Sequence, residues 1–98
     1  MYCKLEQDLA FDWDGANIEH IGRHGVAPGD VVEVLSNGAT DLRYEVLKGE
    51  ERWTSIGHTG QLRILIKVWK MRGELIRVVT AFDAGKVMAS EYLRQQGC

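Results

Sequence analysis

The stretch Leu62-Arg-Ile-Leu-Ile-Lys-Val-Trp69, followed after Lys70-Met-Arg-Gly-Glu74 by Leu75-Ile-Arg-Val-Val-Thr-Ala-Phe82, decides the fold of this chain. Both apolar runs are rich in β-branched and aromatic residues, and the short gap between them holds a glycine. This pattern predicts a β-hairpin with a short loop. Because side chains alternate between the two faces of a strand, the hairpin has two distinct faces.

The two faces of this hairpin differ in character. The side chains of the more apolar face are Leu62, Ile64, Ile66, Val68, Ile76, Val78, Thr80 and Phe82. If this face forms the core, Arg63, Lys67 and Arg77 gather on the outer face. Trp69 lies on the same side. Lysine and arginine commonly occupy the solvated face of an antiparallel sheet, so a purely solvated face is the simpler interpretation.

Charge is unevenly distributed along the chain. The 98 residues carry a net charge of -2, which argues against a protein that is basic throughout. Residues 1–50 hold four Lys/Arg and ten Asp/Glu, whereas residues 51–98 hold eight and four. This asymmetry predicts a local cationic site on an acidic body, suited to a polyanion or to an acidic partner protein.

Length and composition predict one small domain over residues 1–98. No apolar run reaches the length of a membrane span, because Lys67 and Arg77 interrupt the longest ones. The first residues lack the apolar centre of a signal peptide, so we expect a cytoplasmic protein. Cys3 and Cys98 match neither a zinc pattern nor a disulfide framework, and we expect reduced thiols, with a terminal disulfide left open.

The segments before the hairpin predict two short helices. Asp14 is a suitable N-cap for a helix over residues 15–24. Pro28 fits the first turn of a second helix, which ends near Gly38. The side chains expected to face the core are Ile18, Ile21, Val31, Val34 and Leu35.

The rest of the chain predicts further strands and a final helix. Residues 40–46 alternate with period two, and residues 51–57 form another strand candidate. Residues 84–96 predict a helix, whose buried side carries Val87, Met88 and Tyr92. The expected fold class is α+β in two layers: N-terminal helices, a four-stranded antiparallel meander and a C-terminal helix, with the helices on one sheet face.

Three short motifs in chain order carry a resemblance to a known family. They are Phe11-Asp-Trp-Asp14 with Arg23-His-Gly-Val26, then Gly49-Glu-Glu-Arg-Trp53 with Ile56-Gly57, then Arg77-Val-Val-Thr-Ala81 with Tyr92. Together, in this order, they make the chain resemble the BrnT toxin family, whose members share the RelE-like ribonuclease fold. The residues that this resemblance singles out are Trp13, Arg23, His24 and Glu51.

The resemblance implies a ribosome-independent endoribonuclease that inhibits translation and needs no metal or other cofactor. It also implies a ribbon-helix-helix antitoxin (BrnA-like) as partner, in a toxin–antitoxin hetero-oligomer, and a homodimer is a further possibility. Phe82 stands where relatives carry Arg, and Met88 where they carry Glu. These departures leave an alternative open: a domain with weakened catalysis that serves as a binding partner of an antitoxin-type repressor.

Cleavage of RNA without a metal needs a base, an acid and cations that stabilise the extra charge on phosphorus. Arg63 and Arg77 are the predicted catalytic cations, because arginine suits phosphate geometry. The predicted RNA-binding residues are Arg52, Trp53, Lys67 and Trp69. Flat indole rings suit unstacked bases, although tryptophan is more often a core residue.

His58 and Tyr92 are the predicted acid–base residues, with Glu51 and His24 as further candidates. Histidine readily exchanges a proton near neutral pH, although a solvated loop histidine is the simpler interpretation of His58. Tyr92 can donate a hydrogen bond to phosphate, or it can simply anchor the last helix on the sheet. His20 and His24 have a spacing that can hold zinc, but no third ligand is evident, so we expect no metal.

Overall fold

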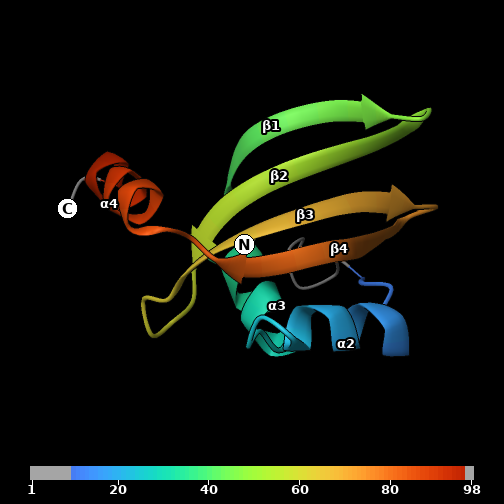
Figure 1. Cartoon of the computed structure of the whole chain (residues 1–98), viewed down its shortest axis with the longest axis horizontal. Coiled ribbons are helices and arrows are strands. Elements are labelled where there is room, and N and C mark those ends of the chain that lie inside the picture. Colours follow the sequence, from blue (N-terminus) through green and yellow to red (C-terminus); the bar gives the residue numbers. More distant parts are fainter. Residues whose placement is uncertain (1–9, 97–98) are drawn as a thin grey trace, which may run out of the picture.

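The structure, a computed structural model, describes residues 10–96, which form three helices and one four-stranded sheet. The elements are α2 (Gly15–Gly22), α3 (Pro28–Ser36), β1 (Thr40–Leu47), β2 (Glu50–His58), β3 (Ile64–Arg72), β4 (Leu75–Asp83) and α4 (Lys86–Gln95). Each strand runs antiparallel to its sequence neighbour, in the order β1-β2-β3-β4 (Figure 1). The predicted α+β class, with its meander and its order of helices, is confirmed.

Helix α2 begins where the sequence predicts an N-cap. The Asp14 carboxylate accepts hydrogen bonds from the backbone N–H groups of Ala16 (2.9 Å) and Asn17 (3.1 Å). The Asn17 side-chain oxygen accepts one from the Asp14 N–H (2.9 Å). This reciprocal capping satisfies N–H groups that have no partner within the helix. Gly25 follows the helix with a φ of +73°, a left-handed conformation that glycine adopts without strain.

Helix α3 is short and depends on packing. Pro28 lies in its first turn, as predicted, and the Asp30 carboxylate accepts a hydrogen bond from the Ala27 N–H (3.0 Å). Val31 and Val34 are buried against the sheet. Burying two valine side chains stabilises the fold by about 3–6 kcal/mol, so the apolar stripe rather than helix propensity holds α3 in place.

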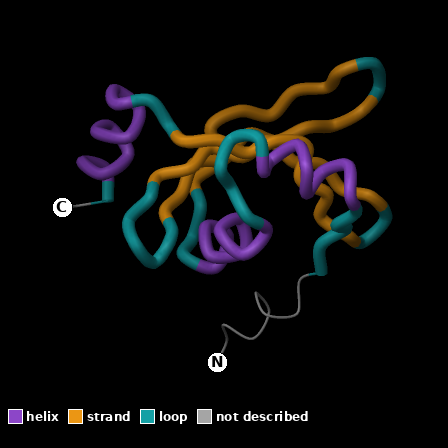
Figure 2. The backbone as a smooth tube through the Cα atoms, turned by 60° about the horizontal axis from the view of Figure 1, so that its bottom comes forward, coloured by secondary structure: helices purple, strands orange, loops and turns teal. Residues whose placement is uncertain are grey.

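The two faces of the sheet are covered differently. Helices α2 and α3 pack on one face, the helix-covered face, and its core residues are Ile21, Val26, Val31, Val34, Leu65, Val78 and Ala81. Helix α4 lies apart from them (Figure 2) and contacts the opposite face at the end where β2 and β4 finish. The core residues on that side are Ile56, Ile64, Ile66 and Tyr92. We call the part of this side that α4 leaves uncovered the open face. The helices therefore lie on both faces of the sheet and not on the single face that the sequence predicts.

A bulge in the β3–β4 hairpin decides which side chains share a face. Val68 pairs with Thr80, but the next residue of β3, Trp69, pairs with Val78, so Val79 has no partner on β3. Side chains on a strand change face at every residue, so one extra residue reverses the alternation. Beyond the bulge, the β4 residues lie on the face opposite to the one that uninterrupted pairing predicts.

The bulge separates the cations of the hairpin. Lys67 pairs with Ala81 on the helix-covered face, whereas Arg77 pairs with Lys70 on the open face. The expectation that Arg63, Lys67 and Arg77 share one outer face is therefore wrong. The predicted apolar face divides in the same way. Ile64 and Ile66, with Phe82 packed against them, lie on the side of α4, whereas Val78 packs against α2 and α3.

Three side chains that the sequence predicts for the core are exposed. The exposed fractions of Ile18, Val87 and Met88 are 41%, 83% and 41%. Helix α4 stands at the end of the sheet (Figure 1), so only part of its surface meets other elements. Among the described residues of α4, Tyr92 alone is buried, and this part of the prediction is confirmed.

No helix within residues 10–96 is long and apolar enough to cross a membrane. Cys3 and Cys98 lie outside the described residues, so the expectation of reduced thiols stays a prediction.

Gly57 lies on the helix-covered face, where α3 approaches β2 closely. A Cβ atom here would lie 2.6 Å from Val34 Cγ1 and 3.2 Å from Ala39 Cβ. We expect Gly57→Ala to destabilise the fold by about 1–3 kcal/mol, because the overpacked groups must shift. Urea unfolding followed by circular dichroism measures this change. Gly22→Ala is the matched control, since nothing lies within 4 Å of its Cβ, and equal midpoints for the two variants would contradict the close contact.

Candidate functional site

Three cations from adjacent strands line a cleft on the open face. Arg52 precedes Trp53 in β2, and Lys70 follows Trp69 in β3, and the two tryptophans are cross-strand partners. Lys70 pairs in turn with Arg77 of β4. The cleft has a volume of about 290 Å³. Its lining residues are Ala16, Asn17, His20, Arg52, Lys70, Arg77, Val78 and Val79, and we call it the basic cleft.

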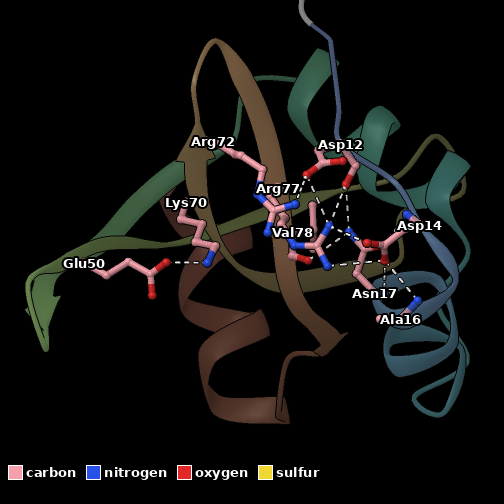
Figure 3. A network of polar contacts seen from close by, with 9 residues as sticks. All are labelled: Asp12, Asp14, Ala16, Asn17, Glu50, Lys70, Arg72, Arg77 and Val78. Carbon is pink, nitrogen blue, oxygen red and sulfur yellow. Dashed lines mark hydrogen bonds and ion pairs between the residues drawn. The ribbon is translucent and has the colours of Figure 1, made fainter.

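Carboxylates at the start of α2 hold Arg77 in place (Figure 3). Its guanidinium lies 3.3 Å from the Asp12 carboxylate and 3.1 Å from that of Asp14. Arg72 reaches the same Asp12 oxygen at 3.0 Å. The hydrogen bond from Arg77 is the main cause of the lowered pKa of Asp14, and the same contact raises the pKa of Arg77. Both groups are therefore ionised at neutral pH.

The buried amide of Asn17 fixes α2 against the edge of β4. Its Nδ2 donates to the Asp12 carbonyl (2.9 Å) and to the Val78 carbonyl (3.4 Å), as Figure 3 shows. The side chain also caps α2 through its oxygen, so three segments meet at one residue. This arrangement sets the position of the α2 wall of the basic cleft.

Glu50 lies on the other side of the basic cleft. Its carboxylate accepts hydrogen bonds from Lys70 Nζ and from the Arg52 guanidinium (3.1 Å). These contacts, that of Lys70 first, lower the pKa of Glu50. Arg52 Nε is buried and has no hydrogen-bond partner within residues 10–96. A buried guanidinium N–H without a partner is costly, so a bound anion would stabilise it.

The basic cleft carries a small excess of positive charge. Its ion pairs join four cations to three carboxylates, a formal excess of one. The residues are Arg52, Lys70, Arg72 and Arg77, with Glu50, Asp12 and Asp14. Fixed, paired cations keep a defined geometry for an anion, and they attract it less strongly than unpaired ones.

His20 is the titratable residue of the basic cleft that the sequence does not assign to the site. The sequence suggests His20 only as a zinc ligand together with His24. The ring centres of the two histidines are 5.8 Å apart. Within residues 10–96, no group of three His, Cys, Asp or Glu side chains is arranged to hold a metal ion. Only the position of α2 beside β4 brings His20 to the cleft, and no local motif signals it.

His58 and Tyr92 are brought together as a pair. The His58 Nδ1 and the Tyr92 hydroxyl lie 2.7 Å apart, a hydrogen-bond distance. Tyr92 is buried and His58 is half-buried. The pair lies at the α4 end of the sheet, six residues along β2 from Arg52, which is about 20 Å at the usual rise of a strand. The structure thus unites two predicted catalytic residues and separates them from Arg77.

Arg63 belongs neither to the basic cleft nor to the His58–Tyr92 pair. Its guanidinium binds Asp83 through two hydrogen bonds, Nε–Oδ1 (2.8 Å) and Nη2–Oδ2 (3.0 Å), and lies 3.4 Å from Asp30 of α3. The hydrogen bond to Asp83 is the main cause of the raised pKa of Arg63 and of the lowered pKa of Asp83. Arg63 therefore joins β4 to α3, and this network explains its position without a ligand.

Lys67 is buried on the helix-covered face, contrary to the expected solvent-facing position. It is 1% exposed, and its Nζ has no hydrogen-bond partner within residues 10–96. The Nζ lies 5.6 Å from the ring centre of Trp69 and 6.0 Å from that of Phe11, at cation–π distances. Burial lowers the pKa of Lys67 to about 8, and the charge of Asp41 partly opposes this shift.

Trp53 and Trp69 stack on each other on the helix-covered face. Their ring centres are 4.8 Å apart with an interplanar angle of 18°. Trp69 Nε1 donates to the Ser55 hydroxyl (3.0 Å), which donates to the Asp41 carboxylate (2.7 Å). Tyr44 continues the row, with its ring centre 5.4 Å from that of Trp53. This aromatic row lies on the face opposite the basic cleft.

The remaining motif residues are spread over the surface and the core edge. Trp13 stacks on Phe11 (5.7 Å between ring centres) and packs against the core. The others are Arg23, which pairs with Glu19 at 3.5 Å, His24, whose ring lies 6.0 Å from that of Phe82, and Glu51, which accepts a hydrogen bond from the Tyr44 hydroxyl (2.7 Å). These contacts do not bring the motif residues into one site.

An apolar hollow lies on the open face between the basic cleft and the His58–Tyr92 pair. It has a volume of about 390 Å³ and is lined by Leu42, Arg43, Thr54, Ile66, Phe82 and Met88. Phe82 and Met88, which depart from the pattern of the BrnT proteins that the sequence resembles, therefore lie together here. Their apolar side chains give the hollow a surface suited to bases or to apolar groups rather than to phosphate.

No protein-family model matches the chain, and no curated protein matches it either. The resemblance to the BrnT family therefore remains a prediction from the motifs.

Lys67 gives the stability of the fold a defined dependence on pH. Its pKa is about 8 in the folded chain against an ordinary value of 10.5. Between these values the unfolded chain holds a proton that the folded chain lacks, so stability rises with pH. At pH values below both pKa values, Lys67 is protonated in the folded and in the unfolded chain. Burying its charge then lowers the stability of the folded chain by about 3 kcal/mol.

We expect Lys67→Met to raise the free energy of unfolding at neutral pH by about 2–3 kcal/mol, because it removes the buried charge. It should also remove the rise in stability over the alkaline range. Urea titrations of parent and variant at several pH values measure both effects. Lys86→Met, at an exposed position, is the control. Equal stability of Lys67→Met and the parent at neutral pH would show that Lys67 is solvated.

Proposed function

We propose that the chain is a metal-independent endoribonuclease of the toxin class, and that it binds a short single strand of RNA along the open face. The observation that supports this most is the His58–Tyr92 hydrogen bond of 2.7 Å on the sheet face that carries the basic cleft. Inhibition of translation, a cytoplasmic location and a ribbon-helix-helix antitoxin as partner belong to the same proposal.

The basic cleft is the proposed site for a phosphate of the bound strand away from the cleavage point, because the His58–Tyr92 pair lies about 20 Å from Arg52. Arg52, Lys70 and Arg77 come from three adjacent strands, so a regular sheet rather than a loop fixes their spacing. Charged donors in fixed positions suit the oxygen atoms of a phosphate. The apolar hollow beside the cleft provides a surface for unstacked bases, a role that the sequence assigns to Trp53 and Trp69.

The His58–Tyr92 pair is the proposed acid–base centre. Tyr92 is buried, and its hydroxyl lies at hydrogen-bond distance from His58 Nδ1, so Tyr92 acts as a positioning residue. His58 is half-buried, and its Nε2 is the atom that takes the proton from the ribose 2′-hydroxyl in the proposed reaction. The 2′-oxygen then attacks phosphorus, the bond to the 5′-oxygen breaks, and a protonated acid delivers a proton to that leaving oxygen.

Variants at the two sites separate cleavage from binding. We expect His58→Ala to lower the cleavage rate about 100-fold or more while RNA affinity is retained, since it removes the base. Lys70→Ala should instead weaken RNA binding, with a lower salt dependence, because one phosphate contact is lost. Gel analysis of single-stranded RNA in EDTA and fluorescence anisotropy measure the two quantities, with Lys86→Ala as the control.

Intact RNA after long incubation with the parent chain would contradict the proposed reaction. Full cleavage by His58→Ala would place the chemistry elsewhere.

A second function is favoured by the compensated charges of the basic cleft. Arg77 is already paired with Asp12 and Asp14, and Phe82 and Met88 make the neighbouring hollow apolar. These features suit a binding partner of an antitoxin-type repressor with little catalysis of its own. Co-expression with the neighbouring open reading frame, followed by size-exclusion chromatography, tests this function. A stable complex together with inactive parent chain would favour it, and absence of a complex would count against it.

A further inference from the structure

The two edges of the sheet are not equivalent. At the β4 edge, the Ile76 N–H donates to the Ala10 carbonyl (3.0 Å), and the Ile76 carbonyl accepts from the Asp12 N–H (2.8 Å). The Asn17 amide occupies the Val78 carbonyl on the same edge (3.4 Å). At the other edge, nothing within residues 10–96 pairs with the outer side of β1. The fold thus closes one edge and leaves β1 available.

Strand β1 exposes several apolar side chains along its outer edge. The exposed fractions of its apolar residues lie between 44% and 54%; the residues are Leu42, Tyr44, Val46 and Leu47. Neither proline nor lysine occurs in Thr40–Leu47, although these residues commonly keep an edge from pairing with another chain. A bulge between Asp41 and Arg43 distorts only the start of the strand. The regular part, residues 43–47, is a template for a further strand.

The turn after β1 fixes which backbone groups point outward. Residues 48–49 connect β1 to β2 with φ angles of +53° and +80°, as in a type I′ turn. In such a hairpin the flanking pair, Leu47 with Glu50, is hydrogen-bonded, and bonded and non-bonded pairs alternate from there. Tyr44 and Val46 therefore direct their N–H and C=O groups away from β2.

Charge favours one of the symmetric ways to pair β1 with a second copy. A two-fold axis through Tyr44 places Arg43 of each copy opposite Glu45 of the other. An axis through Arg43 or through Glu45 instead sets two like charges against each other. Opposite charges facing across two strands stabilise a sheet and like charges destabilise it. We infer that the chain forms a homodimer by antiparallel pairing of β1 with β1 of a second copy, centred on Tyr44.

This pairing uses both faces of the strand. Arg43 and Glu45 lie 3.7 Å apart in one copy, and the Arg43 side chain is 68% exposed, so this contact can exchange for the two contacts across the dimer. On the other face, Tyr44 extends the row of Trp53 and Trp69. The two rows meet at the axis, where paired aromatic side chains add to the stability of the sheet.

Reversal of single charges tests the register. Size-exclusion chromatography with light scattering on the full chain should show, as the concentration rises, a mass approaching twice the 11.0 kDa of one chain. Arg43→Glu alone, or Glu45→Arg alone, should raise the dimer dissociation constant about tenfold, because like charges then face each other twice. The double variant Arg43→Glu/Glu45→Arg should restore the parent affinity. Circular dichroism confirms that each variant is folded.

Cross-linking tests the axis directly. In a background with Cys3→Ser and Cys98→Ser, Tyr44→Cys should form a disulfide between copies on oxidation, since the axis brings this residue against its own copy. Val46→Cys is the control, because it lies opposite Leu42 and not opposite itself. A single-chain mass at every concentration overturns the proposal. A dimer whose affinity is unchanged by Arg43→Glu and by Glu45→Arg overturns it as well. Equal cross-linking of Tyr44→Cys and Val46→Cys also overturns it.

Discussion

The unpaired residue Val79 in β4 is the constraint on which the arrangement of charges depends. It moves Arg77 from the face of Lys67 to that of Lys70, while Lys67 stays against the main core. Without it, the open face would lack one of the three strand cations of the basic cleft. A one-residue change in register is enough because side-chain direction alternates at every position of a strand.

The surroundings of Lys67 explain how the fold tolerates this buried lysine. Lys67 occupies a core position that an apolar residue would fill at lower cost, and nearby aromatic rings and a depressed pKa reduce the charge penalty. On the open face, by contrast, the cations are paired with carboxylates and remain partly accessible to solvent. The buried cation thus has a lowered pKa, and the surface cations are held in place by carboxylates.

Local signals in the sequence predict most of the elements. The Asp14 cap, the Pro28 start and the central hairpin are all found, because each depends on neighbours in the chain. The side-chain faces of the hairpin are not predicted correctly, since no residue type marks the bulge at Val79. His20 is missed for a related reason: tertiary packing alone places α2 beside β4. The sequence predicts His58 and Tyr92 as acid–base residues, and only the fold shows that they touch.

Cross-strand contacts in the β3–β4 hairpin distinguish bulged pairing from regular pairing. A nuclear Overhauser spectrum of the isotopically labelled chain should show backbone contacts between Trp69 and Val78 and between Lys70 and Arg77. Contacts between Trp69 and Val79 instead, with Lys70 opposite Val78, would mean that the strands pair without a bulge. Arg77 would then lie on the face of Lys67, and the basic cleft on the open face would not exist.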